Sequence, residues 1–233
     1  MMTKTRKISL AVFSVLLSAL LILSGWMIYQ EVSSRQKEKE EFDTLAELVE
    51  VTPDKQPDET AIPTDTAPES NEDTEALRDL SALFEQNRDC IGWLCIPDTT
   101  INYPVMHTPN NPQKYLRRSF YGEYSQSGVP FLDNRCGLDS TNLIIYGHNM
   151  KNGTMFSDLK HYLDQTFLEE HPTIELQTED GVRYFTVTEV LKTDIHDQWY
   201  EHISRDDGRQ YLVLSTCHGS AKSGRLLIIA TEN

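Results

Sequence analysis

The sequence is short of positive charge. Its 233 residues include 21 lysines and arginines against 36 aspartates and glutamates, a net charge of −15 with neutral histidines. Nucleic-acid-binding proteins draw much of their affinity from basic groups on phosphates, so this balance argues against a nucleic acid as partner. The acidity is concentrated: residues 40–75 hold thirteen acidic groups and one basic group, whereas residues 1–39 hold two acidic and six basic groups.

Cysteine is also scarce and is not arranged for metal binding. The four cysteines contain no Cys-x-x-Cys pair and no cluster with histidine at ligand spacing, which argues against a structural zinc site. We expect Cys90, Cys95 and Cys136 to be unpaired packing residues, since the ends of a predicted strand at 91–96 are too far apart for a disulfide unless the chain turns. Neither a metal nor a cofactor is expected.

Long apolar runs are absent except at the amino terminus. Residues 8–29 carry no charge, and as a helix at ~1.5 Å per residue they reach ~33 Å, enough for a bilayer core of ~30 Å. A cleaved signal peptide is the alternative, but its apolar region usually spans only ~7–15 residues and ends in small residues. We therefore predict an uncleaved anchor. The basic residues flanking it are balanced and leave its orientation open.

The flanks of this span complete the predicted domain organisation. Residues 1–7 are expected to be a cytoplasmic terminus, and residues 30–75 an acidic tether rich in Pro and Thr. Such a composition buries too little apolar area to offset the entropy of ordering. Two interpretations fit the tether equally well: a spacer that holds the domain away from the membrane, and a disordered connector whose length has no function. Residues 76–233 have the length of one ordinary domain.

Short β-prone runs dominate that domain. A helix is predicted to begin near Asp73 or Thr74 and to carry Leu77, Leu80, Leu83 and Phe84 on one face. Eight strands follow at a spacing typical of a closed barrel or sandwich, at 91–96, 101–106, 129–132, 143–146, 173–177, 182–191, 210–216 and 225–231. One internal helix is predicted near Thr154, with Met155, Phe156, Leu159, Tyr162 and Leu163 on its apolar face.

Three chemically active side chains stand at predicted strand ends. Cys217 closes one apolar strand, Arg225 opens the next, and His148 follows a third. If the first two strands form an antiparallel hairpin, Cys217 and Arg225 lie opposite each other, with Cα atoms ~4.5–5.5 Å apart. A thiolate, an imidazole and a guanidinium suit acyl transfer. From spacing alone, a buried cysteine, a structural histidine and a surface ion pair remain the more common explanation.

Several separate motifs in one order resemble the sortase family, in its class B branch. They include Leu214-Ser215-Thr216-Cys217, Tyr146-Gly147-His148-Asn149-Met150, and Arg225 before an apolar strand. The resemblance extends over nearly all of residues 77–231 through the segments at 92–97, 101–105, 115–116, 128–133 and 153–159.

The resemblance implies a mostly β fold, an eight-stranded barrel with an amino-terminal helix and one or two short internal helices. It also implies a membrane-anchored transpeptidase on the outer face of a Gram-positive cell, which settles the orientation. Such an enzyme cleaves a carboxy-terminal sorting signal of the LPXTG or NPXTN kind. It holds the product as a thioester and passes it to an amine of peptidoglycan, its lipid-linked precursor or a pilin.

Matching the motifs gives each residue an expected role. Cys217 is the nucleophile, His148 the general acid and then base, and Arg225 the group that stabilises the oxyanion and orients the substrate. Ser215, Thr216 and Leu116 match positions that line the substrate groove. One departure concerns the stretch before the cysteine strand, where class B members carry a long helix-bearing insertion and this chain has about twenty residues, 192–211. Which signal the groove selects is left open.

Two other functions fit the same residues. In a plain cysteine endopeptidase, water rather than an amine resolves the thioester. In a non-catalytic, membrane-tethered binding module, the barrel only presents a peptide groove. The residues themselves do not separate these alternatives.

Overall fold

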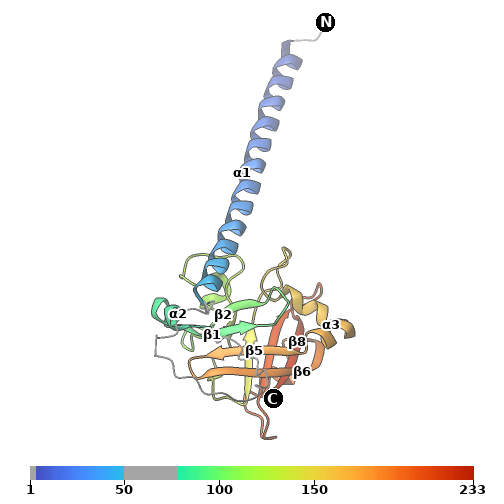
Figure 1. Cartoon of the computed structure of the whole chain (residues 1–233). Helices are drawn as coiled ribbons and strands as arrows, with labels where there is room; N and C mark the ends of the chain where they lie inside the picture. Colours follow the sequence, from blue (N-terminus) through green and yellow to red (C-terminus); the bar gives the residue numbers. More distant parts are fainter. Residues whose placement is uncertain (1–3, 50–77) are drawn as a thin grey trace, which may run out of the picture. The chain divides into compact units, whose positions relative to one another are not determined.

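The computed structural model describes residues 4–49 and 78–233 (Figure 1). The chain divides into two compact units, Met1–Asp43 and Thr44–Asn233. The expected tether beyond residue 49 and the predicted helix start at Asp73 or Thr74 lie outside the described residues.

The amino-terminal part is a single helix, α1, which spans Lys4–Val49. Over Phe13–Val49 it is long and apolar enough to cross a membrane. It continues beyond the predicted span at 8–29, so residues 30–49 of the expected tether are helical. Contacts one turn apart support this extension: Arg35 bonds to Glu31 at 2.7 Å and Gln36 to Glu40 at 3.0 Å. No proline interrupts the chain before Pro53.

The helix predicted before the first strand is shorter than expected. α2 spans Ser81–Gln86, and the described residues before it, 78–80, are not helical. The local reason is Asp79, whose carboxylate accepts a hydrogen bond from the backbone N–H of Ser81 and so forms a turn immediately before the helix. Leu80 and Leu83 are buried, as the apolar pattern predicted.

All eight predicted strands form, and they close into a barrel. Its strand order is β1-β2-β3-β4-β7-β8-β6-β5. The strands are β1 (Cys90–Cys95), β2 (Asn102–Met106), β3 (Phe131–Leu132), β4 (Asn142–Tyr146), β5 (Thr173–Thr178), β6 (Gly181–Asp194), β7 (Tyr211–Cys217) and β8 (Gly224–Glu232). This confirms the predicted fold class.

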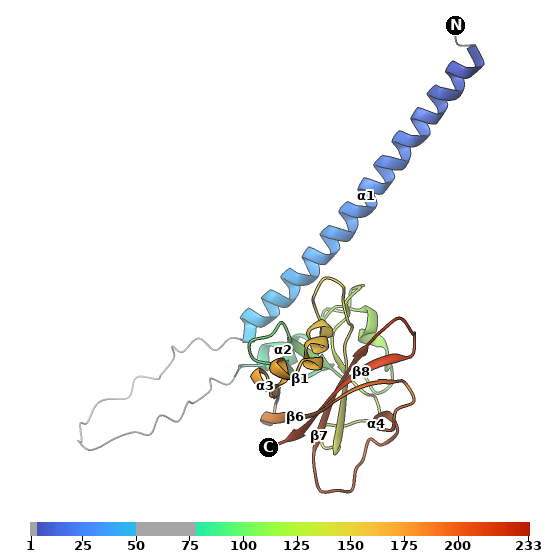
Figure 2. The ribbon, with the colours of Figure 1, turned by 90° about the vertical axis from the view of Figure 1, so that its right-hand side faces the viewer.

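Three strands that run side by side in the barrel are β4, β7 and β8. β4 pairs with β7 in parallel, and β7 pairs with β8 as an antiparallel hairpin. Their sequences are continuous apolar runs, and successive residues are buried along most of each strand. η2 (Phe156–Leu163) packs against β7 and β8. Figure 2 shows this side of the domain.

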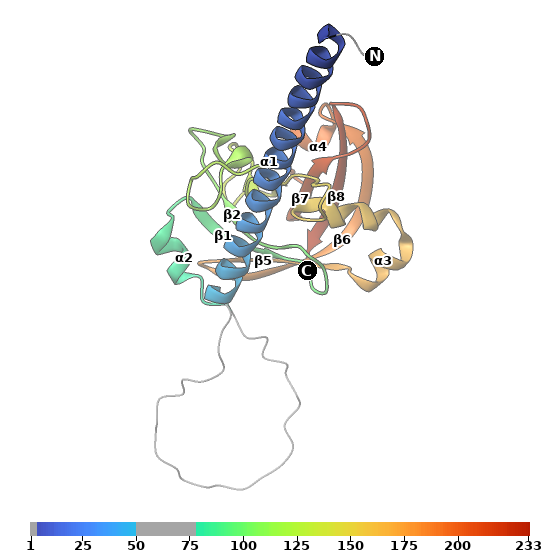
Figure 3. The same cartoon turned by 90° about the horizontal axis from the view of Figure 1, so that it is seen from above.

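The remaining helices are short. η2 is a 3-10 helix where the sequence predicted an ordinary internal helix, and α3 (Gln165–Glu170) follows it directly. Phe156, Leu159 and Tyr162 are buried as predicted, but Leu163 is 41 % exposed because the tighter helix turns it away from the core. The others are η1 (Lys114–Arg117) and α4 (Gln198–Glu201). α2 and α3 lie on opposite sides of the barrel (Figure 3).

Candidate active site

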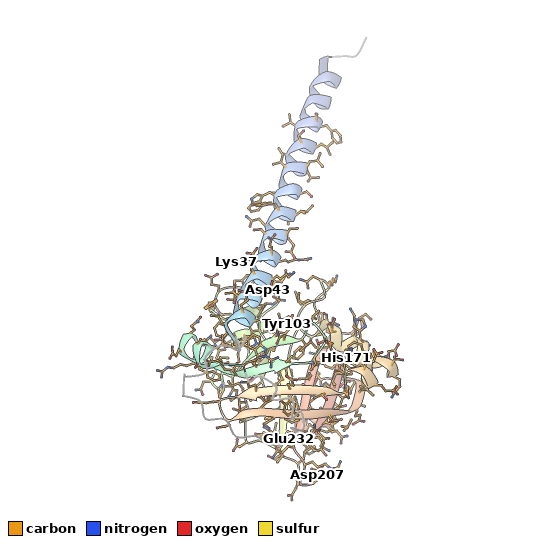
Figure 4. All side chains as sticks on the ribbon, in the orientation of Figure 1. Lys37, Asp43, Tyr103, His171, Asp207 and Glu232 are labelled. Atoms are coloured by element: carbon orange, nitrogen blue, oxygen red, sulfur yellow. The ribbon has the colours of Figure 1, made fainter. Side chains whose placement is uncertain are left out.

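Cys217 and Arg225 face each other across the β7–β8 hairpin. They are register partners at its loop end, where β7 stops and β8 begins. This is the arrangement that the sequence predicted from two consecutive apolar strands. The loop carrying Asp207 precedes β7 and lies at the other end of the barrel (Figure 4).

His148 reaches the same end through the parallel pair of β4 and β7. Tyr146 is the register partner of Ser215, so His148 and Cys217 each lie two residues beyond the same rung. Successive side chains of extended chain alternate between faces, so two residues on they return to the same face. The topology therefore brings together the three residues that the sequence singled out.

Side-chain bonds continue this pairing after the strands end. The Thr216 hydroxyl donates to the Gly147 carbonyl at 2.8 Å, and the Asn149 amide donates to the Cys217 carbonyl at 3.0 Å. The residues on both sides of His148 are thus tied to the chain around Cys217. Asn149 belongs to the histidine motif named above, but no role was predicted for it.

All six predicted site residues line one groove, which has a volume of about 350 Å³. Cys217, His148, Arg225, Ser215, Thr216 and Leu116 line it, together with Tyr146, Asp133 and others. Cys217 is exposed, whereas Ser215 and Thr216 are buried in the groove floor. The groove is therefore open at the thiol and firmly packed beneath it.

The imidazole of His148 is oriented by the backbone. Its Nε2–H donates to the Leu116 carbonyl at 3.0 Å, which leaves Nδ1 as the nitrogen that gains and loses a proton. Burial lowers the pKa of His148 below its ordinary value, the bond to Leu116 opposes that change, and the nearby Arg117 cation adds to it. The neutral imidazole is therefore favoured near pH 7.

Arg225 is held by backbone carbonyls. Its Nη1 donates to Lys222 at 3.1 Å and to Gly224 at 2.8 Å. Within the described residues it forms no ion pair with a carboxylate, so the surface ion pair considered from the sequence is not what positions it. The guanidinium remains charged, and its other N–H groups are available to a molecule bound in the groove.

A polar network centred on the buried Asp133 supports the groove wall beside Arg225. Asp133 accepts two hydrogen bonds from the Arg135 guanidinium, at 2.9 and 2.8 Å, and one from the Tyr146 hydroxyl at 2.7 Å. Burial by itself would raise the pKa of the Asp133 carboxyl, but these bonds outweigh it and the pKa is lowered. Asp133 therefore stays ionised. No role was predicted for Asp133 or Arg135 from the sequence.

Tyr200 of α4 is a further residue that the sequence did not single out. Its hydroxyl lies 2.6 Å from the Ser215 hydroxyl, and its ring stacks on Tyr146 at 6.2 Å between centroids. Because Tyr200 lies in a separate element from Ser215, no local sequence pattern links the two residues. The short stretch before β7 thus still contributes a helix that contacts two residues of the groove, Ser215 and Tyr146.

The other three cysteines differ from Cys217 in their surroundings. All are buried, and none of the four forms a disulfide, as the sequence predicted. Burial raises the pKa of Cys90 to about 11 and raises the pKa values of Cys95 and Cys136 as well. Thiolate chemistry near neutral pH is therefore disfavoured at these three positions.

Gly147 is required by close packing. A Cβ atom at this position would lie 2.5 Å from the Phe156 ring. We expect Gly147→Ala to lower the free energy of unfolding by about 1–3 kcal/mol, since the ring is fully buried. Urea unfolding measures this. At the control position Gly137, the added atom meets only the Asp139 carboxylate, which can turn away, so Gly137→Ala should cost clearly less. Equal costs would contradict this interpretation.

The family model described as the sortase domain matches residues 94–233. Sortase B of Listeria monocytogenes is 34 % identical over 196 residues, which cover 82 % of this chain and 73 % of that protein. Sortase B of Staphylococcus aureus is 28 % identical over 193 residues, covering 82 % and 72 % respectively.

Solved structures give the same result. A sortase B–substrate complex from Staphylococcus aureus matches with a TM-score of 0.58 and 28 % identity, over 66 % of this chain and 84 % of that one. Sortase B of Bacillus anthracis matches with a TM-score of 0.65 and 26 % identity, over 86 % and 98 %. On the combined evidence of barrel, family match and relatives, the chain belongs to the sortase family of cysteine transpeptidases, in its class B branch.

Proposed function

We propose that this chain cleaves a carboxy-terminal sorting signal of the LPXTG or NPXTN kind and transfers the product to an amine of peptidoglycan or of a pilin. The observation that carries the proposal is the meeting of Cys217, His148 and Arg225 at one end of the barrel. Sortases act on sorting-signal peptides and amines, and the proposal assigns this chemistry to particular residues here.

In the first half-reaction the Cys217 thiolate attacks the carbonyl carbon of the scissile amide. A C–S bond forms, and Arg225 donates hydrogen bonds to the developing oxyanion. As the C–N bond breaks, protonated His148 gives its proton to the departing amine. The acyl group is left as a thioester on Cys217.

In the second half-reaction an incoming amine attacks the thioester carbonyl. Neutral His148 accepts the proton of the attacking nitrogen, a C–N bond forms, and the C–S bond breaks to return the thiolate. Ser215, Thr216 and Leu116 line the groove and would contact the sorting peptide. If water attacks instead of the amine, the same site acts as an endopeptidase.

The proposed location follows from the apolar helix. Residues 8–29 would cross the cell membrane once, with residues 1–7 in the cytoplasm, and residues 30–75 would connect the anchor to an extracellular catalytic domain at 76–233. The described helix over Phe13–Val49 supports an anchor by its length and composition. An external domain can meet both the secreted proteins and the wall amines.

The test uses the purified chain in detergent with candidate sorting peptides and an amine, either glycine or diaminopimelate. Transfer predicts a thioester adduct on Cys217 by mass spectrometry and an amide product that contains the amine. Hydrolysis products alone with every amine would make the chain an endopeptidase. Peptide binding with neither adduct nor cleavage would leave only a binding module.

A pH–rate profile with two well-separated limbs is expected, because the productive pair of thiolate and protonated His148 is a minor species. Arg117→Gln should move its acidic limb to higher pH. The Arg117 cation contributes to lowering the pKa of His148, so removing that charge lets this pKa rise. The rate falls on the acid side as the pH drops below the His148 pKa, hence the upward shift.

The matched control is Arg118→Gln, which removes an equal charge from a side chain bonded to the Gly122 carbonyl. Steady-state kcat/KM from pH 4 to 10 measures both variants. A limb that stays in place or moves to lower pH in Arg117→Gln would contradict the proposed role of His148.

A further inference from the structure

A second pocket of about 440 Å³ adjoins the groove. It shares Tyr146 and Arg225 with the groove, and the rest of its wall comes from Arg135 and from the segment that contains α4. The lining residues are Arg135, Tyr146, Ile195, His196, Tyr200, Glu201 and Arg225. We call this the side pocket. None of the proposed chemical steps uses Arg135, His196 or Glu201.

The side pocket has an excess of cationic hydrogen-bond donors. Arg135 uses Nε and Nη2 on Asp133, and Arg225 uses Nη1 on two carbonyls. Within the described residues, Nη1 of Arg135 and Nε and Nη2 of Arg225 have no protein acceptor. Among the described residues, Glu201 supplies the only carboxylate that lines the pocket, and its side chain is exposed. Two guanidiniums with spare N–H groups on one concave wall fit an anion.

We propose that the side pocket binds a carboxylate carried by one of the two substrates of the transfer reaction, with Arg135 as its main ligand. The inference rests on the proposed function, since it requires a peptide or an amine at Cys217. The carboxylate could belong to an acidic side chain of the sorting peptide or to the acceptor amine, and the chemistry of recognition is the same.

The position of the side pocket supports this reading. Arg225 lines both the groove and the side pocket, and it is the register partner of Cys217. A substrate that reacts at the Cys217 sulfur and extends past Arg225 would therefore enter the side pocket. The stacked rings of Tyr146 and Tyr200 give one wall a flat surface. The ion pair with Asp133 already holds the Arg135 side chain in place, so Arg135 loses little side-chain entropy when it binds a carboxylate.

The test compares matched charged and neutral substrates in the full chain in detergent. One arm fixes the sorting peptide and uses glycine or glycinamide as acceptor. The other fixes the acceptor and places Glu or Gln at the variable position of the motif and at each of the three positions before it. Each arm gives a ratio of kcat/KM for the charged over the neutral substrate. Differences in intrinsic reactivity cancel when this ratio is compared between variants.

Arg135→Gln should lower the charged-to-neutral ratio about five- to tenfold in one arm, the loss expected for a charge-assisted bond. Glu201→Gln removes the one negative group and should raise the same ratio about twofold. Opposite changes at two residues exclude a general loss of folding. Arg209→Gln, which removes an exposed cation outside the side pocket, should leave both ratios unchanged.

A changed ratio in the glycine arm assigns the carboxylate to the acceptor, and a changed ratio in the Glu arm assigns it to the sorting peptide. Transfer that proceeds with unchanged ratios in both arms, for Arg135→Gln and Glu201→Gln alike, overturns the inference but leaves the proposed function intact. Absence of thioester and product from the unmodified chain would instead overturn the proposed function.

Discussion

Cys217→Ala is expected to abolish both the thioester and the transfer product, with kcat at least about 10³-fold lower. The reason is that no other thiol can replace it. Cys217 is the exposed cysteine at the groove, whereas Cys90, Cys95 and Cys136 are buried and their pKa values are raised. Mass spectrometry of the intact chain with a sorting peptide, together with product analysis, measures the effect.

Cys136→Ala is the matched control. Cys136 is buried outside the groove and bonds to the Asn142 carbonyl, so its loss should affect stability rather than the rate per folded molecule. Alkylation by iodoacetamide at pH 7 should label the unmodified chain and Cys136→Ala once, and Cys217→Ala not at all. A thioester that persists in Cys217→Ala would refute the assignment of the nucleophile.

The barrel could be predicted from the sequence because each strand is marked by a local run of apolar residues between turn residues. β7 and β8 are apolar runs separated by a short loop, which favours a hairpin and fixes Cys217 opposite Arg225. The parallel pairing of β4 and β7 is different. It joins segments about seventy residues apart, so the approach of His148 to Cys217 followed only from the family motifs.

The helices were predicted less well, and for local physical reasons. The pattern of Phe156, Leu159 and Tyr162 gives the buried face of η2, but the same spacing fits an α-helix and a 3-10 helix nearly equally well. α2 begins directly after a turn in which the Asp79 carboxylate bonds to the Ser81 N–H, and Asp73 and Thr74 carry the same sequence signal for a helix start. Apolar periodicity predicts which side chains are buried better than where a helix begins.

The residues that support the groove from behind were the least predictable part of the site. Tyr200 comes from α4 and Arg135 from a loop, and each acts through contacts across the fold: Tyr200 with Ser215, and Arg135 with Asp133, which also bonds to Tyr146. Such pairs leave no periodic signal in a single sequence. The signal that could have suggested one of these pairs is chemical: Asp133 and Arg135 carry opposite charges two residues apart in the sequence.

His148→Ala is expected to lower kcat/KM about 10²- to 10⁴-fold, the range for loss of a general acid and base. The alkaline limb of the pH–rate profile should disappear, because the rate no longer depends on a protonated imidazole that is lost as the pH rises. His171→Ala is the matched control. His171 lies at the end of α3, away from the groove, and bonds to the Pro97 carbonyl, so its replacement should leave the profile unchanged (Figure 4).

A second acyl-donor substrate tests whether His148 transfers a proton or only holds the site in place. An activated aryl ester of the sorting peptide has a leaving group that departs without a proton, so the thioester should form from it far faster than from the amide donor in His148→Ala. The loss relative to the unmodified chain should therefore be much smaller with the ester. An equal loss with both donors would mean that His148 does not protonate the leaving amine. Its role would then be to hold the groove through Leu116, to which its ring is bonded.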